Sequence, residues 1–350
     1  MTSITVVAKA AGVSIATVSR VINHLPQVAP DTAAAVHRAM EEVGYRPNRM
    51  SHRRARDAAP QSWPAGVRHG SVAILFPDTR EEALRTALSG RLVHGVNTAL
   101  SPVGMTIVST PLTYDGGLPS MVASGAVDGL IVRTTVPVAH LVAAIPPMPI
   151  VWLLELTEPY LPRGDQVLED TAAIGRLAAR QLLARGHRRL AILNHEPAHP
   201  SYQRRTRAFL AEAQAAGAQV DVLEPPSAIS PEEIPTLVQR FRDLPDRPTG
   251  MLLPVSDAGL VIFHRALIDL GLRSGTDLEI VACANDLFLP EALGHGLFNI
   301  NIHPEAIAQA AGDLLLWRLA NLDAPRRRVL IEPSLDLTAA GDARKKPWAT

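Results

Sequence analysis

A single arginine, Arg20, lies in the segment AGVSIATVSRVIN (residues 11–23) among small, hydroxyl-bearing and β-branched residues. An arginine guanidinium can donate two parallel hydrogen bonds to the edge of a guanine. Small or slim side chains, here Ile15 and Ala16, let a helix backbone approach base edges, while hydroxyl and amide groups hold phosphates. The residues suited to phosphate contacts are Thr17, Ser19 and Asn23. These residue types at this spacing predict recognition of the DNA major groove.

The elements that must position these residues are short helices. Apolar residues recur at helical spacing over residues 4–11, with Ser3 as the N-cap, and Gly12 ends this helix. Ser14 caps a second helix, and a third covers residues 31–43 and is closed by a glycine. The predicted buried stripe of the second helix consists of Val18, Val21 and Ile22. The arrangement is typical of a helix-turn-helix, and the alternative is a small helical hairpin with a solvated arginine.

Charge is unevenly distributed along a chain that is neutral as a whole, with 34 basic and 34 acidic residues among 350. Residues 1–60 carry a net charge of +4, and the remainder therefore carries −4. A basic N-terminal part indicates a partner that is a polyanion. The hydrophobic fraction of 47% excludes disorder for most of the chain.

Cysteine usage and apolar runs bear on the compartment. Cys283 is the only cysteine, so an internal disulfide is excluded and a reducing compartment is favoured. The N-terminus lacks the pattern of a signal peptide, and prolines interrupt the longest apolar stretch, LVAAIPPMPIVWLLEL. We therefore expect a cytoplasmic, nucleoid-associated protein that has no membrane partner.

Downstream of the head, strand-like and helix-like segments alternate. The predicted strands are SVAILF, MTIVST, VDGLIV, MPIVWLL, RRLAIL, GMLLPV and LEIVAC. Alternation with amphipathic stretches predicts parallel sheets covered on both faces, and so many strands favour two doubly wound α/β lobes. The predicted domains are a helix-turn-helix head (1–48), a hinge and linker (49–69), a two-lobed core (70–338) and a disordered tail (339–350).

The string covering residues 4–48 resembles the DNA-binding domain of the LacI/GalR (lac-repressor) family of transcriptional regulators, which shows the patterns VAxxAGVSxxTVSRVxN and GYxPN. The resemblance implies that Ile15, Ala16 and Arg20 read bases. It also implies that a second set contacts or positions the DNA backbone, namely Ser14, Thr17, Ser19, Asn23 and Asn48. One departure is Val6, where an acidic residue often precedes the motif.

The family resemblance weakens in the stretch RPNRMSHRRARDAAPQSW. Family members have a hinge helix here, whose leucine enters the minor groove and kinks the DNA. Counting from Asn48 places Arg54 at the position of that leucine. An arginine is no apolar wedge, but Arg54 can enter a narrow minor groove together with Arg49, Arg53 and Arg56. The alternative is a solvated basic linker, and in both cases we expect loose coupling between head and core.

Residues 70–337 resemble the sensor core of the same family, which is similar to periplasmic sugar-binding proteins: two α/β lobes with a ligand cleft between them. Arg205 stands where the family has an arginine that holds effector hydroxyls or carboxylate. Asn285 replaces a common aspartate, Asp170 matches the aspartate of a usual Asp-Asn pair, and Ser256 replaces an asparagine. These substitutions leave the effector open, and Arg205 is alternatively a surface arginine in an arginine run.

Residues 195–199 spell HEPAH, which matches the HExxH pattern of zinc proteases. That pattern binds zinc on a helix, where both histidines share one face, but Pro197 and Pro200 oppose a continuous helix. We therefore predict a loop that lines the cleft, with no metal and no cofactor. Cys283 falls in an apolar strand and is predicted to be a core residue rather than a nucleophile.

These observations favour a sequence-specific DNA-binding transcriptional regulator, a repressor, that is controlled by a small-molecule effector such as a sugar or related metabolite. It would bind near-palindromic double-stranded operators as a homodimer, because one small head makes too few contacts. One alternative is a regulator whose core has lost ligand binding and serves only as a dimerisation scaffold. The other is a hydrolase or another α/β enzyme.

Overall fold

The computed structural model describes residues 4–22, 28–45, 63–77, 86–112, 117–133, 143–154, 163–255, 257–286 and 289–336. The chain forms two compact units, Met1–Ser62 and Trp63–Thr350. The domain boundaries expected from the sequence stay predictions, and the expected tail lies outside the described residues. None of the helices in the described ranges is long and apolar enough to cross a bilayer.

The described part of the first unit is helical and has its own small core. Its helices are α1 (Ile4–Ala11), α2 (Ile15–Ile22) and α3 (Pro30–Glu42). The side chains of Val18 and Val21 on α2 are buried against α1 and α3 in one cluster, as the apolar spacing predicts. Ile22 is half-buried beside them, so the predicted stripe is confirmed.

Local signals explain where these helices begin and end. Gly12 ends α1 in a left-handed conformation (φ 63°), which glycine adopts without steric cost. The backbone N–H of Val13 then donates to the carbonyl of Ala8 at 3.0 Å. The Ser14 hydroxyl accepts the backbone N–H of Thr17 at 3.1 Å, so the predicted cap of α2 is confirmed. The predicted N-cap of α1, Ser3, lies outside the described residues.

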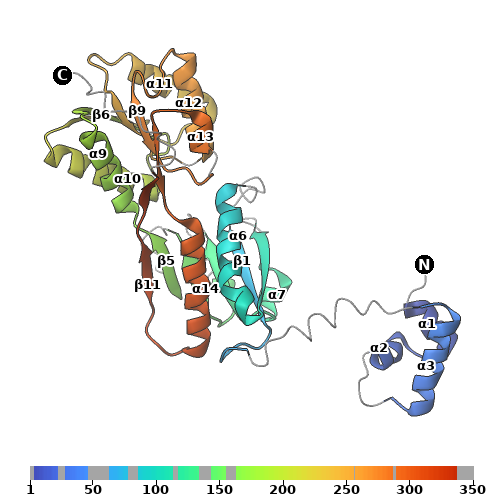
Figure 1. Cartoon of the computed structure of the whole chain (residues 1–350). Helices are drawn as coiled ribbons and strands as arrows, with labels where there is room; N and C mark the ends of the chain where they lie inside the picture. The colour runs from blue at the N-terminus through green and yellow to red at the C-terminus, as the bar shows by residue number, and fades with distance from the viewer. Residues whose placement is uncertain are drawn as a thin grey trace. The chain divides into compact units, whose positions relative to one another are not determined.

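The second unit contains two lobes, each built around one sheet (Figure 1). In the described chain the first sheet has the strand order β11-β5-β4-β3-β1-β2, all parallel. Its strands are β1 (Ser71–Pro77), β2 (Thr106–Leu112), β3 (Gly129–Arg133), β4 (Ile150–Leu153), β5 (Asp165–Glu169) and β11 (Arg328–Ile331). Its helical elements are α6 (Ala87–Leu100), the 3-10 turn η1 (Ser101–Val103), α7 (Ser120–Ala123) and α14 (Pro304–Ala320).

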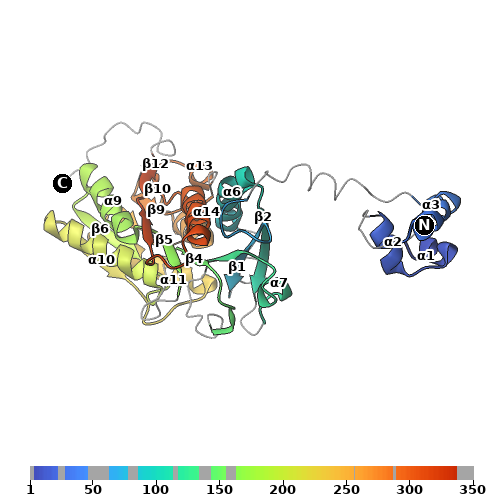
Figure 2. The same ribbon diagram turned by 90° about the horizontal axis from the view of Figure 1, so that it is seen from below.

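Both faces of this first sheet are buried. Val72, Ile74 and Phe76 on β1 belong to one apolar cluster, which α6 and α14 complete. Ala73 and Leu75, which point to the opposite face, belong to another. Figure 2 shows α6 and α14 side by side along one face of the sheet. Burial on both faces accounts for the nearly continuous apolar run SVAILF.

The second sheet has the order β12-β10-β9-β8-β6-β7 in the described chain, with β12 antiparallel to β10. Its strands are β6 (Arg189–Leu193), β7 (Gln219–Leu223), β8 (Gly250–Leu252), β9 (Glu279–Ala282), β10 (Leu297–Asn301) and β12 (Ser334–Asp336). Its helical elements are α9 (Thr171–Ala184), α10 (Pro200–Ala215), η2 (Pro231–Glu233), α11 (Ile234–Arg242), α12 (Asp257–Asp269) and α13 (Leu289–Leu293).

The described chain passes between the lobes at three places: between β5 and α9, between β10 and α14, and between β11 and β12. At the second crossing His303 has a left-handed backbone (φ 59°) directly before α14. Its Nε2 lies 2.9 Å from the Ser334 hydroxyl at the start of β12, so a contact joins two of the crossings. All seven strands predicted from apolar runs are present, and the two-lobed prediction is confirmed.

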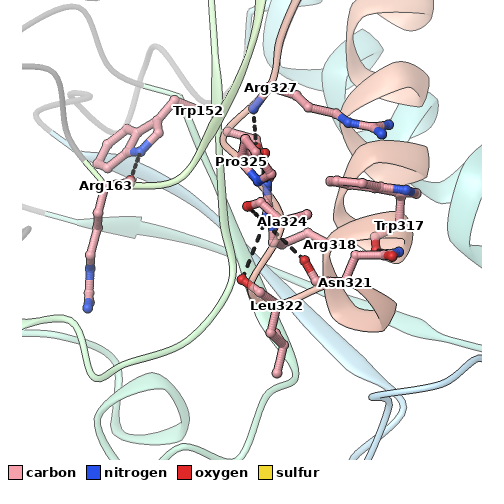
Figure 3. A network of polar contacts seen from close by, with 10 residues as sticks. Trp152, Arg163, Trp317, Arg318, Asn321, Leu322, Ala324, Pro325 and Arg327 are labelled. Atoms are coloured by element: carbon pink, nitrogen blue, oxygen red, sulfur yellow. Dashed lines mark hydrogen bonds and ion pairs between the residues drawn. The ribbon is translucent and has the colours of Figure 1, made fainter.

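A buried ion pair fixes the amino end of β5. Arg318 on α14 donates to both carboxylate oxygens of Asp165, at 2.7 and 2.8 Å, and the Asp165 side chain is fully buried. Arg318 also donates to carbonyl oxygens in the turn between α14 and β11, and Arg327 stacks on Trp317 (Figure 3). The backbone N–H of Arg327 donates to Asp165 at 2.7 Å. This network holds β11 in register beside β5.

Candidate functional site

The surface of α2 presents two of the residues predicted to read bases, Ile15 and Arg20. Arg20 is exposed, and the apolar side chain of Ile15 is 48% exposed at the start of the helix. Val18 and Val21 face the core instead, so the two faces of α2 differ in character. An exposed arginine and an exposed aliphatic side chain near the start of a helix fit the requirements for reading base edges in a major groove.

Of the other residues predicted to contact DNA, some lie within the described ranges and some lie outside them. The Ser14 side chain is exposed and lies 2.9 Å from the half-buried hydroxyl of Thr17. Ala16 and Ser19 lie within α2. The remaining predicted residues fall outside the described ranges: Asn23, Asn48, Arg49 and Arg54. All of these assignments stay predictions.

A cleft of about 360 Å³ lies between the two lobes of the second unit. Its walls come from the carboxyl ends of strands in both sheets and from the start of α10, the edge at which open α/β sheets bind ligands. The residues that line it are Leu88, Arg133, Leu154, Glu169, Glu196, His199, Ser201, Tyr202, Arg205, Cys283, Asn285 and Ile302. The volume lies at the lower end of the range for small-molecule sites.

The first lobe contributes charged groups to this cleft. Arg133 is the last residue of β3, and its Nε atom is buried without a hydrogen-bond partner in the part of the chain that the structure describes. Glu169 is the last residue of β5, is 6% exposed, and accepts a hydrogen bond from the Thr171 hydroxyl at 3.2 Å. Between them Leu154 follows β4 with a left-handed backbone (φ 64°), a strained conformation of the kind found at ligand sites.

The second lobe contributes an aromatic and cationic wall at the start of α10. The ring of His199 stacks on that of Tyr202, with centroids 4.0 Å apart. The Arg205 guanidinium lies 5.5 Å from the Tyr202 centroid, is 7% exposed as a residue, and donates to the Pro254 carbonyl at 3.4 Å. Its Nε has no partner in the described structure. Arg205 is therefore a buried cleft residue and not a surface arginine.

Asn285 lies where the two lobes meet. Its backbone N–H donates to Asp257 at 2.6 Å, and its carbonyl accepts from Arg91 on α6 of the first lobe at 2.7 Å. Its side-chain Oδ1 is buried and has no hydrogen-bond partner among the described residues. Asn285 thus combines a fixed backbone, bonded to both lobes, with a free acceptor in the cleft.

The predicted effector residues are only partly brought together. Arg205 and Asn285 both line the cleft, whereas Ser256 lies outside the described residues. Asp170 is not among the lining residues; its carboxylate caps α9 by accepting the N–H of Ala173 at 2.8 Å. The sequence reasoning missed Arg133 and Glu169. The available signal was a charged residue directly at the carboxyl end of a parallel strand.

Burial shapes the protonation of the cleft. Burial lowers the pKa of Arg133 from its usual value, although the charge of Glu169 opposes this effect. Burial, with the charges of Arg205 and Arg133, lowers the pKa of His199 to about 4. His199 is therefore neutral at pH 7, while the positive potential of both arginines extends to its ring.

The HEPAH segment forms the loop before α10 and not a helix, as predicted, and Glu196 and His199 from it line the cleft. Within the described ranges, no group of three histidine, cysteine or carboxylate side chains is arranged to hold a metal ion. Cys283 is 4% exposed and donates to the carbonyl of Ile300 at 3.2 Å, and burial raises the pKa of its thiol. It is a buried thiol at the floor of the cleft.

A three-helix head with an exposed second helix and a two-lobed α/β core with a polar cleft together define a class of proteins: DNA-binding transcriptional regulators with a ligand-binding core. Residues 3–48 match the family of bacterial regulatory proteins of the lacI type, and residues 179–337 match the periplasmic binding protein-like domain. The chain belongs to the LacI family of transcriptional regulators.

Individual relatives agree with this assignment. The HTH-type transcriptional regulator AglR of Rhizobium meliloti (strain 1021) is 30% identical over 284 residues, which cover 77% of this chain and 74% of that protein. A complex of the regulator CelR with cellobiose has a TM-score of 0.66 at 24% identity and covers 97% of this chain and 100% of that one. The lac repressor dimer bound to operator and the anti-inducer ONPF has a TM-score of 0.60 at 21% identity, with 98% of each chain covered. Because both identities are below 25%, these two structures support the fold of this chain and not its ligands.

Proposed function

We propose that this regulator is a repressor that binds a near-palindromic operator as a homodimer and is controlled by a small molecule, a sugar or related metabolite, bound in the cleft. Arg20, Ile15 and Ala16 would read bases, and Ser14, Thr17, Ser19, Asn23 and Asn48 would hold the DNA backbone. Arg49 and Arg54 would enter the minor groove. Effector contacts are proposed for Arg205 and Asn285, which line the cleft, and for Ser256, whereas Asp170 caps α9 and is left out of the proposed site.

The observation that carries effector control is the set of unpaired buried polar atoms in the cleft. Arg133 Nε, Arg205 Nε and Asn285 Oδ1 are all buried without a partner in the described structure. A buried polar group without a hydrogen bond destabilises a fold by roughly 1–3 kcal/mol, so several in one cavity indicate that a ligand completes them. A core that served only for dimerisation would be expected to have lost such a cluster.

Two exposed aliphatic side chains on α12 support homodimerisation. Val261 and Ile268 are 44% and 51% exposed, and they stand seven residues apart on one side of this helix. Exposed aliphatic side chains in a row are typical of a surface that packs against another protein. A second copy of the chain would bring a second head to the other half of a palindromic operator. The proposed location is the cytoplasm, with the nucleoid.

The test begins with the DNA upstream of the protein's own gene. The purified full chain is expected to protect a near-palindromic segment there from nuclease digestion. Monosaccharides and related metabolites are then screened for two effects: a rise in melting temperature and a change in operator occupancy. Binding of effector and operator are thermodynamically linked, so an effector must show both effects. Protection that no small molecule changes would support the scaffold alternative, and the absence of any protected segment would contradict the proposal.

A further inference from the structure

We propose that the effector carries an anionic group, a carboxylate or a phosphate, which Arg133 and Arg205 grip from opposite lobes. The inference rests on the proposed function, because it names the chemistry of the molecule bound in that same cleft. Arg133 and Arg205 are called the cleft arginines below.

Three largely buried arginines elsewhere in this unit show what the cleft arginines lack. Arg91, Arg185 and Arg318 each donate through Nε and Nη2 to the two oxygens of one carboxylate. The partners of these three arginines are Glu305, Glu279 and Asp165. In both cleft arginines Nε is buried without a partner, and neither forms an ion pair within the described residues. Among the described residues, the chain supplies a carboxylate to the first three arginines and none to the cleft arginines, and we assign that place to a ligand.

The charge of the cleft points the same way. Two guanidinium groups face a single deeply buried carboxylate, that of Glu169. The other carboxylate of the lining, Glu196, has a side chain that is 41% exposed and is therefore screened by water. His199 is neutral at pH 7, as its lowered pKa shows. Counted over the buried groups that the structure describes, two arginines against Glu169 leave one positive charge, which a bound anion would neutralise; Glu196 balances it formally but lies in water.

Geometry and size narrow the ligand further. A planar guanidinium with two parallel donors matches the two oxygens of a carboxylate or a phosphate. The stacked rings of His199 and Tyr202 provide a flat face beside Arg205, against which the carbon skeleton of a small polar molecule can lie. A cleft of about 360 Å³ accepts one molecule of monosaccharide size. The class is therefore a small anion of monosaccharide size: either a sugar acid, which carries one negative charge at pH 7, or a sugar phosphate, which carries about 1.5 to 2.

Because the two arginines lie on different lobes, binding of this anion depends on whether the cleft is open or closed. Arg133 ends β3 in the first lobe, and Arg205 lies on α10 in the second. Without a ligand, two like charges on facing lobes repel each other. A bound anion attracts both and draws the lobes together, which gives it a different affinity for the open and closed cleft, as a ligand-driven switch requires.

The experiment uses the full-length protein and compounds that differ mainly in charge. Melting temperature and affinity by calorimetry are measured with D-gluconate, D-glucuronate, glucose 6-phosphate, inorganic phosphate and neutral D-glucose, all at one ionic strength. The variants are Arg133→Gln, which removes the charge, and Arg133→Lys, which keeps it. The control is Arg180→Gln, which removes an arginine whose side chain is 62% exposed on α9, away from both the cleft and the proposed dimer surface.

We expect at least one anion to stabilise the wild type more than glucose does. Arg133→Gln should lower its affinity at least about tenfold, as loss of a charge-assisted bidentate contact implies, whereas Arg133→Lys should lose less and Arg180→Gln nothing. Binding of gluconate or glucuronate alone would assign a sugar acid, and binding of glucose 6-phosphate alone a sugar phosphate. If Arg133→Gln fails to fold, the comparison of each anion with glucose on the wild type and on Arg133→Lys decides.

Two outcomes would overturn the inference. The first is that no anion stabilises the wild type more than it stabilises Arg133→Gln. The second is that glucose or another neutral sugar binds equally well to both proteins and changes operator occupancy; the proposed effector control would then stand, with a neutral effector. If the proposed regulation by an effector is itself wrong, the result differs from both of these outcomes, because no compound, charged or neutral, then changes the occupancy of the operator.

Discussion

Replacing Asp165 by asparagine is expected to destabilise the core strongly, because it removes the charge that Arg318 binds inside the first lobe. The Asp165 side chain is fully buried and the Arg318 side chain is 9% exposed, so water replaces neither partner. Breaking a buried ion pair by removing one charge typically costs about 3–5 kcal/mol. Asparagine keeps an acceptor oxygen, but its amide group meets a guanidinium that also donates.

The structure places this substitution at the lower end of that range. Arg318 keeps carbonyl partners in the turn after α14, with distances of 3.0 Å to Asn321, 2.6 Å to Ala324 and 2.9 Å to Pro325. These carbonyls continue to stabilise the cation when the carboxylate charge is lost. We therefore expect a loss of about 3 kcal/mol in the free energy of unfolding, which corresponds to a decrease of roughly 6–12 °C in melting temperature.

The assay is thermal and urea unfolding of the full chain, followed by tryptophan fluorescence, to which the buried Trp152 on β4 contributes. The matched control is Asp243→Asn, which breaks an Asp-Arg pair at the end of α11 whose side chains are 56% and 39% exposed. An exposed pair contributes about 0–1 kcal/mol, so the control should melt close to the wild type. Equal melting temperatures for both variants would refute the reasoning that burial makes the Asp165 pair strong.

Three further predictions follow from single positions. Gly175→Ala would place a methyl carbon 2.2 Å from a backbone oxygen of α10, so it should destabilise the core by about 1–3 kcal/mol and weaken effector binding. The control Gly90→Ala, whose added carbon meets nothing within 4 Å, should change neither quantity. Thermal-shift titrations measure both. Burial and the cleft arginines lower the pKa of His199 to about 4, below its value of about 6.5 in the unfolded chain. The unfolded chain therefore takes up the proton first, and the free energy of unfolding decreases as pH falls from 6.5 to 4. His199→Gln should reduce the decrease in urea midpoint between pH 7 and pH 5, and an equal decrease in both proteins would contradict this prediction. Val261→Glu combined with Ile268→Glu should convert a dimer into monomers in light scattering, and an unchanged mass would show that α12 is not the interface.

The main features of the fold could be predicted because apolar runs mark buried parallel strands. Segments such as SVAILF and RRLAIL are buried on both faces and carry almost no polar residue at their centres. β5 was missed because its sequence, DQVLE, begins and ends with carboxylates. The burial of Asp165 depends on Arg318, which follows it by 153 residues, so no local pattern reveals it. β7 was missed because it is an edge strand with alternating polar residues.

The candidate site was less predictable than the fold. Arg205 and Asn285 were found because their motifs resemble those of the family. Arg133 was missed because a charged residue at the end of a strand normally faces water, and only the second lobe turns that position into a cleft. Asp170 was predicted as a ligand contact but does not line the cleft. An acidic residue directly before a helix suits a helix cap as well as a ligand contact, and Asp170 is the cap of α9.

The central claim, that α2 reads bases through Arg20, is tested most directly by selecting bound duplexes from a random pool with the wild type and with Arg20→Ala. The wild type should enrich a near-palindrome with a guanine in each half. Because each lost guanine contact costs about 1–3 kcal/mol and a dimer has two, Arg20→Ala should lose that guanine preference and bind the selected site at least roughly 30-fold more weakly. Arg38→Ala, which removes an exposed arginine from α3, should keep the preference. An unchanged guanine preference in Arg20→Ala would contradict the account.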